Sequence, residues 1–148
     1  LYSKKRHLFS EVIFDTSNNN SEKRISELYT IFDVSASDYW DSHYNFGVVS
    51  TRRKKKLSKK FIDLLIINTI IPIQFCYAKQ MGKDVSEILF KLASSISAEE
   101  NSIIKKYNEL RPEIHSAFES QALIQLKTEY CNNMRCLDCA MGNAILKG

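Results

Sequence analysis

The chain has 148 residues, enough for one folded domain that buries roughly two-thirds of the surface exposed by its unfolded form. A hydrophobic fraction of 44% and a charged fraction of 26% are ordinary for a globular protein and exclude a disordered or fibrous chain. The net charge of +4 comes from one basic segment beside a mildly acidic remainder, which excludes a uniformly basic protein of the histone kind.

Few turn-forming residues, 4 Gly and 2 Pro, favour helices over many short strands. We therefore predict an all-α fold of about six to seven helices in a single domain, 1–148. Apolar spacing indicates a first helix over 1–14 and a second that Asn20 or Ser21 caps. The aromatic stretch 39–47 predicts a short helix or turn held down by burial of its rings, followed by an exposed loop.

The longest predicted helix, 59–80, is apolar around most of its circumference and begins after the capping residue Ser58. Such a helix lies in a core or in a membrane. Its apolar run is short for a span and contains Asp63 and Asn68, so we expect the central helix of a core, with both polar side chains bonded within the fold. Pro72 should kink this helix.

Capping signals divide the second half of the chain. Asp84 to Glu87 and Ser97 to Glu100 both have the spacing of a capping box, and Pro112 ends the helix that follows the second. The predicted helices run over 85–95, 98–110, 113–130 and 140–147.

Three of the four cysteines, Cys131, Cys136 and Cys139, fall within nine residues. A disulfide framework spreads its cysteines more widely, so we predict a reducing, cytoplasmic compartment. Thiolates at this C-x4-C-x2-C spacing bind zinc or an iron–sulfur cluster, and we predict a structural metal site at these residues. The fourth ligand would come from upstream or from one of Cys76, His115, His43 and His7.

Two alternatives stay open for the cysteines. Reduced thiols also pack as small hydrophobic side chains. If the segment were one continuous helix, Cys136 and Cys139 would share a face and Cys131 would lie off it. Closely spaced thiols can also act as a redox switch.

A basic strip precedes and enters the long helix. Its members are Arg52, Arg53, Lys54, Lys55, Lys56, Lys59 and Lys60. Such a run can grip DNA or RNA phosphates, and the nearby rings of Tyr39, Trp40 and Tyr44 could stack on exposed bases. The alternative is a solvated loop that keeps the protein soluble.

The sequence carries no recognised catalytic motif. Asp38, Asp41 and His43 are the only group that suggests a small acid–base or metal site, and hydrogen bonding of His43 within the fold is the simpler explanation. We expect no catalytic activity in this fragment.

Five segments carry a resemblance to a known family. They are Tyr-Trp-Asp-Ser-His-Tyr at 39–44, Ile-Ile-Asn-Thr-Ile-Ile-Pro at 66–72, Glu-Asn-Ser-Ile-Ile at 100–104, Ser-Gln-Ala-Leu-Ile-Gln-Leu-Lys at 120–127 and the cysteine stretch 129–140. With these segments the chain resembles the C-terminal half of the bacterial domain-of-unknown-function family 2851. No activity comes with the name.

The resemblance implies a longer protein, as does the first residue, Leu1, so we expect a C-terminal fragment. The family's upstream half carries a Glu-Ile-His-containing strand pattern similar to restriction-endonuclease-like metal nucleases. The chain would then be a non-catalytic accessory part of a nuclease-like protein. Its partners would be DNA or RNA and its own missing N-terminal region, with no membrane. The alternative is a purely structural or protein-interaction helical domain with packed reduced cysteines and no ligand.

Overall fold

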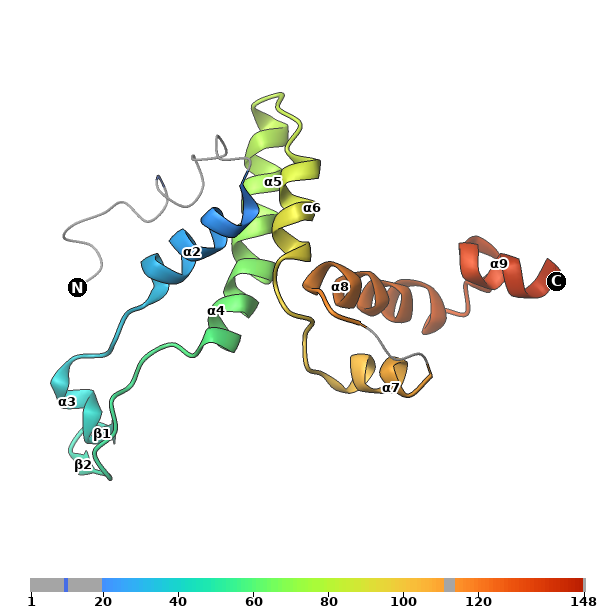
Figure 1. Ribbon diagram of the computed structural model, residues 1–148. Helices are drawn as coiled ribbons and strands as arrows, with labels where there is room; N and C mark the ends of the chain where they lie inside the picture. Colours follow the sequence, from blue (N-terminus) through green and yellow to red (C-terminus); the bar gives the residue numbers. More distant parts are fainter. Residues whose placement is uncertain (1–9, 11–19, 111–113, 148) are drawn as a thin grey trace. The chain divides into compact units, whose positions relative to one another are not determined.

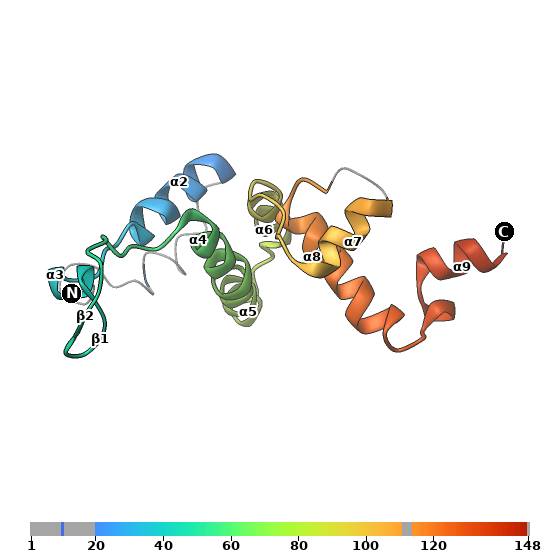
Figure 2. The same cartoon turned by 90° about the horizontal axis from the view of Figure 1, so that it is seen from below.

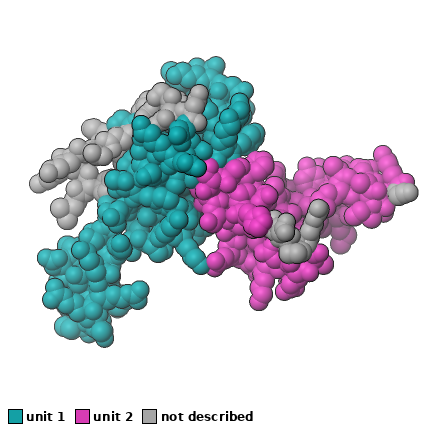
Figure 3. All heavy atoms as spheres, viewed as in Figure 1, with its two compact units in different colours: residues 1–92 teal, residues 93–148 magenta. Residues whose placement is uncertain are grey.

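The computed structural model describes residues 10, 20–110 and 114–147. These residues form helices and one two-stranded hairpin, so the all-α prediction is confirmed. The chain divides into two compact units, 1–92 and 93–148, shown in teal and magenta in Figure 3. The single domain stays a prediction, and the predicted helix 1–14 lies outside the described residues, Ser10 apart.

Unit 1 contains most of the helices (Figure 1). In chain order its elements are α2 (Ser21–Phe32), α3 (Asp38–Asp41), β1 (His43–Asn45), β2 (Val48–Val49), α4 (Lys59–Leu65), the π-helical η2 (Ile66–Ile70), α5 (Ile71–Gln80) and α6 (Ser86–Ser94), whose last residues belong to unit 2. The predicted caps are confirmed at Asn20, which accepts from Lys23 N at 3.1 Å, and at Ser58, which accepts from Phe61 N at 3.2 Å.

The elements α4, η2 and α5 form the predicted long helix, which spans Lys59–Gln80. The irregularity expected at Pro72 takes the form of the π-helical turn just before it. Pro72 has no N–H to donate to the Asn68 carbonyl, and π-turns accommodate such a break in the hydrogen-bond ladder. The helix ends at Gly82, whose positive φ of 68° any larger side chain would resist.

The core of unit 1 forms around this helix. Its fully buried side chains include Leu28 of α2 and Ile66 of η2, and Leu89 and Leu92 of α6 are also buried. Isoleucines and leucines at helical spacing place one stripe inward, and burying each side chain contributes roughly 1.5–3 kcal/mol.

The two polar residues predicted to bond within the fold behave differently. Asp63 accepts a hydrogen bond from the Tyr29 hydroxyl, which joins α4 to α2. Burial, followed by the hydrogen bond and the charge of Asp63, raises the pKa of Tyr29 well above its ordinary value. Asn68 is exposed, so its predicted burial is wrong, and Gln74 is the buried polar residue of this helix.

By length and composition, Lys59–Gln80 is the one helix of the described ranges that could cross a membrane. Its most apolar 18-residue window has a mean hydropathy of 1.7, and 33% of that window is buried. Core helices of soluble proteins pass the same test. A chain without a membrane span stays a prediction.

Unit 2 contains α7 (Ser102–Leu110), α8 (Ala117–Gln125), the π-helical η3 (Leu126–Cys131), the 3-10 turn η4 (Cys136–Asp138) and α9 (Ala140–Lys147). The predicted capping box at Ser97 is wrong. Asn101 caps α7 instead, because its Oδ1 accepts from the N–H groups of Ile103 and Ile104, while Ser97 forms a β-bridge with Ser116. Ser116 and Glu119 form a reciprocal capping box, so α8 begins at Ala117 rather than 113.

Candidate functional site

The segment 35–56, here called the arm, connects α2 to α4 as a long antiparallel excursion (Figures 1 and 2). Backbone contacts join its two sides at several levels: Ser35 to Lys56, Ala36 to Lys55, Asp41 to Arg53, Ser42 to Ser50, His43 to Val49 and Asn45 to Val48. The expected exposed loop is therefore paired along much of its length. Gly47, with a φ of 74°, makes the reversal between β1 and β2.

Aromatic rings in the arm pack against one another. Tyr39 lies parallel to His43, with ring centroids 4.0 Å apart, and Trp40 meets Phe46 edge-on at 5.0 Å. The Tyr39 hydroxyl accepts from Gly47 N at 2.9 Å, which ties the ring to the turn. The predicted ring burial is wrong, since Phe46 is 81% exposed and Tyr44 is 66% exposed. No other element among residues 20–110 covers this antiparallel ribbon, which leaves its rings without a second face against which to be buried.

An open hollow of about 330 Å³ lies in the arm, lined by Ala36, Trp40, His43, Tyr44 and Lys55. Two contacts hold Lys55 at its wall. The ammonium lies 3.5 Å from the centroid of the Tyr44 ring and donates to the His43 carbonyl oxygen. The hollow therefore combines aromatic surface with one fixed positive charge.

The structure separates the basic strip into two groups. Lys55 is half-buried in the arm, Lys56 Nζ lies 3.8 Å from Asp33 Oδ1, and Lys59 Nζ lies 5.2 Å from the Tyr29 ring. Arg52, Arg53 and Lys54 are exposed, as are Lys56 and Lys59. The first three have no carboxylate partner within the described part of the chain. Lys60 is exposed on the first turn of α4.

Asp38, Asp41 and His43 do not form a site. Among the described residues, no three His, Cys, Asp or Glu side chains lie close enough to hold one metal ion. His43 Nδ1 lies 2.7 Å from the Tyr39 carbonyl oxygen and 3.1 Å from Ser42 Oγ, so its hydrogen bonding is local, as predicted. The group offers no acid–base arrangement.

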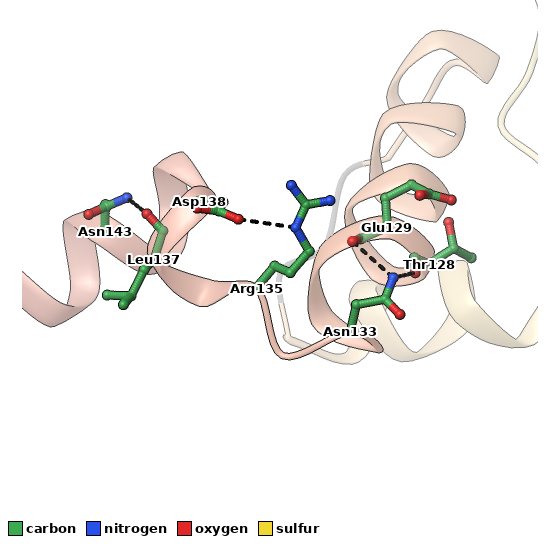
Figure 4. Close-up of polar contacts among 7 residues, drawn as sticks. All are labelled: Thr128, Glu129, Asn133, Arg135, Leu137, Asp138 and Asn143. Carbon is green, nitrogen blue, oxygen red and sulfur yellow. Dashed lines mark hydrogen bonds and ion pairs between the residues drawn. The ribbon is translucent and has the colours of Figure 1, made fainter.

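The cysteine segment links the end of η3 to α9 (Figure 4). Met134 adopts a positive φ of 53°, and Asn133 Nδ2 donates to the carbonyls of Thr128 and Glu129 at the helix end. Arg135 Nε then bonds Asp138 Oδ2 at 3.1 Å across η4. These contacts reverse the chain between Cys131 and Cys136.

The three cysteines have different surroundings. Cys131 and Cys136 are exposed, whereas Cys139 is 8% exposed. Burial, then the Cys131 thiol and Cys139, raise the pKa of the Tyr107 hydroxyl of α7. No sequence pattern points to Tyr107, because only the fold brings α7 to Cys131.

As placed, these donors do not fit a three-cysteine metal centre, because no third ligand joins any two of them in the described ranges. Of the predicted fourth ligands, Cys76 and His115 are exposed, His43 bonds the arm, and His7 lies outside the described residues. Zinc or an iron–sulfur cluster at Cys131, Cys136 and Cys139 stays a prediction.

A comparison of single cysteine variants separates packing from metal binding. Packed thiols predict that Cys139→Ala lowers the free energy of unfolding by roughly 1 kcal/mol, since it leaves a small cavity, and that Cys136→Ala changes it by less than about 0.5 kcal/mol. Urea denaturation of anaerobically purified protein, with its zinc, iron and sulfide content, measures both. Equal, large losses in the two variants together with loss of a stoichiometric metal would establish the metal site instead.

Comparison with protein families places part of the chain in one of them. Residues 1–102 match the family described as "Protein of unknown function (DUF2851)". Two of the five segments that carry the resemblance, 120–127 and 129–140, lie beyond the matched residues. No curated protein and no solved structure matches the chain. Because the match covers more than half of its residues, the chain belongs to the DUF2851 family, whose function is unknown.

Proposed function

We propose that this chain is a non-catalytic accessory part of a nuclease-like, nucleic-acid-processing protein, and that its arm contacts DNA or RNA phosphates. One observation carries the proposal: Arg52, Arg53 and Lys54 are exposed and consecutive on a paired backbone, whereas Lys55 lies over the Tyr44 ring and Lys56 has Asp33 as a partner. Three cations in a row on a braced segment can displace condensed counterions together.

The charge balance of the arm supports the same proposal. Between 35 and 56 the sequence has five cations and two carboxylates, Asp38 and Asp41, whereas the chain outside the basic strip is mildly acidic. A polyanion would therefore be steered towards the arm rather than towards the rest of the molecule.

The family resemblance suggests the partner of this chain, and its free thiols suggest the cellular compartment. The upstream half of longer family members would supply the nuclease-like chemistry and be the partner of this chain. All four cysteines are free, as a reducing bacterial cytoplasm would keep them. The structural metal or cluster at Cys131, Cys136 and Cys139 stays a separate prediction, because among the described residues no three ligating side chains are grouped to hold one ion.

Neutralising the three open cations tests the proposal. We expect Arg52→Ala/Arg53→Ala/Lys54→Ala to weaken binding of a fluorescent 20-mer roughly tenfold to a hundredfold at low salt and to reduce the slope of log K against log salt by about 2–3. Fluorescence anisotropy over a salt series measures both quantities.

The matched control removes the same charge elsewhere. Lys105, Lys106 and Lys127 are exposed lysines of unit 2, and replacing all three by alanine should change affinity far less. Equal losses in the two triple variants, or no binding by wild type at about 20 mM salt, would refute the proposed phosphate contact. Wild type that binds no nucleic acid leaves the structural or protein-interaction alternative.

A further inference from the structure

The hollow of the arm has features that phosphate binding alone does not need. Its lining includes the rings of Trp40, His43 and Tyr44, and its volume of about 330 Å³ is at the lower end of small-molecule sites. A protein that only tracks a duplex backbone needs open cations and no aromatic cavity. The hollow therefore suggests a flat ligand of about one ring system.

The rings around the hollow are already arranged. Tyr39 covers one face of His43 with an interplanar angle of 5°, and the His43 ring also lines the hollow. A third flat ring placed against His43 on the side away from Tyr39 would extend this stack. Contacts from Trp40 and Phe46 support Tyr39, so the platform forms before any ligand arrives.

Polar groups at the hollow suit a base with its phosphate. The Tyr39 carbonyl can only accept, so His43 Nδ1 carries the proton of that hydrogen bond and the His43 ring is fixed in place beside the hollow. Lys55 provides the fixed cation, and the exposed Arg52, Arg53 and Lys54 directly precede it on the same side of the arm. Bases are reached this way only in single strands, because a duplex keeps their faces stacked.

We infer that the arm binds single-stranded nucleic acid, with one unpaired base in the hollow formed by Trp40, His43, Tyr44 and Lys55 and the adjoining phosphates on Arg52 to Lys54. This inference rests on the proposed function and specifies its substrate class. An anionic membrane surface is the competing occupant, since Phe46, Val48 and Val49 at the end of the arm are exposed. Insertion of that apolar tip would not require the hollow or the fixed ammonium.

The first experiment compares ligands on the unaltered chain. Four probes of equal length are titrated at about 50 mM salt: single-stranded DNA, single-stranded RNA, duplex DNA and an abasic single strand. We expect either single strand to bind roughly tenfold tighter than the duplex or the abasic strand, the amount that one stacked base contributes. Trp40 is the only tryptophan, so quenching of its fluorescence should accompany binding of the base-containing strands.

Variants then assign the preference to the hollow. Tyr44→Ala should remove most of the roughly tenfold preference, whereas Tyr44→Phe, which keeps the ring under the Lys55 ammonium, should retain it. Val49→Ser, at an exposed residue that does not line the hollow, should leave it unchanged. Vesicles with anionic headgroups test the membrane alternative. If the apolar tip inserts into them, Val49→Ser should weaken vesicle binding.

The outcomes separate this inference from the proposed function. Equal affinity for single-stranded, duplex and abasic probes would overturn the unpaired base and leave the phosphate contact standing. No affinity for any of the four probes would overturn both. Vesicle binding lost in Val49→Ser, without a single-strand preference, would assign the arm to a membrane surface instead.

Discussion

Replacing Leu28 by alanine is expected to lower the free energy of unfolding of unit 1 by roughly 3–5 kcal/mol. Leu28 of α2 is 0% exposed, and its side chain fills the core in which Ile66 is also fully buried. A leucine-to-alanine change removes three buried carbons and leaves a cavity. The surrounding helices relax only partly into that cavity, so the loss in free energy of unfolding is expected in the range given. Urea denaturation followed by far-ultraviolet circular dichroism measures the loss.

A matched control uses a leucine outside the core. Leu137 of η4 is 73% exposed, so Leu137→Ala should change the same free energy by less than about 0.5 kcal/mol. Similar small losses in both variants would mean that α2 does not pack as described.

The same variant tests whether 1–148 is one domain. Residue-resolved amide hydrogen exchange reports where protection is lost. If Leu28→Ala lowers protection in α2, α4 and α5 and leaves α7 and α8 unchanged, the units of 1–92 and 93–148 unfold separately. A uniform loss across both units would support the single cooperative domain that chain length suggested.

Much of the helical framework could be predicted from the sequence, because its signals are local. The caps at Asn20 and Ser58, the break before Pro72 and the end at Gly82 each depend on a few neighbouring residues. The error at Ser97 shows the limit of such signals. Both Ser97 and Asn101 could cap the helix that follows them. Ser97 pairs instead with Ser116, far along the chain, so the helix begins after Asn101.

The arm could have been expected in part. His43-Tyr44-Asn45 and Val48-Val49 flank a short turn that contains Gly47, which is a weak hairpin signal. The pairing of Ala36 with Lys55 joins residues nineteen positions apart, and no short-range pattern encodes it. That pairing determines that Lys55 lines the hollow and that Arg52, Arg53 and Lys54 have no carboxylate partner among the described residues. The basic strip could therefore be predicted from the sequence, but the different surroundings of its members could not.

The cysteine segment shows the same limit in chemical form. Spacing alone suggested that Cys131, Cys136 and Cys139 share an ion, since a flexible loop can bring any three such thiols together. In the structure the loop has its own conformation, set by Met134 and Asn133. The thiols are therefore held where local backbone hydrogen bonds place them, with Cys139 inward and the other two outward.

Adding one methyl group at Gly142 is expected to release α9 from η4, at a cost of about 3 kcal/mol. A Cβ on Gly142 would lie 2.2 Å from the carbonyl oxygen of Cys136 and 2.9 Å from its carbonyl carbon. Both are backbone atoms, so no side-chain rotation relieves the overlap, and the cost lies at the upper end of that for overpacking. The hydrogen bond from Asn143 Nδ2 to the Leu137 carbonyl would be lost with the contact (Figure 4).

The sign of the change makes Gly142→Ala decisive. In a helix without that contact, alanine in place of glycine stabilises by roughly 0.5–1 kcal/mol, because glycine loses more backbone freedom on folding. Destabilisation together with faster amide exchange in α9 and in the turn at Cys136 would therefore show that the glycine permits close packing of α9 on η4. Stabilisation would show that α9 stands apart from the turn.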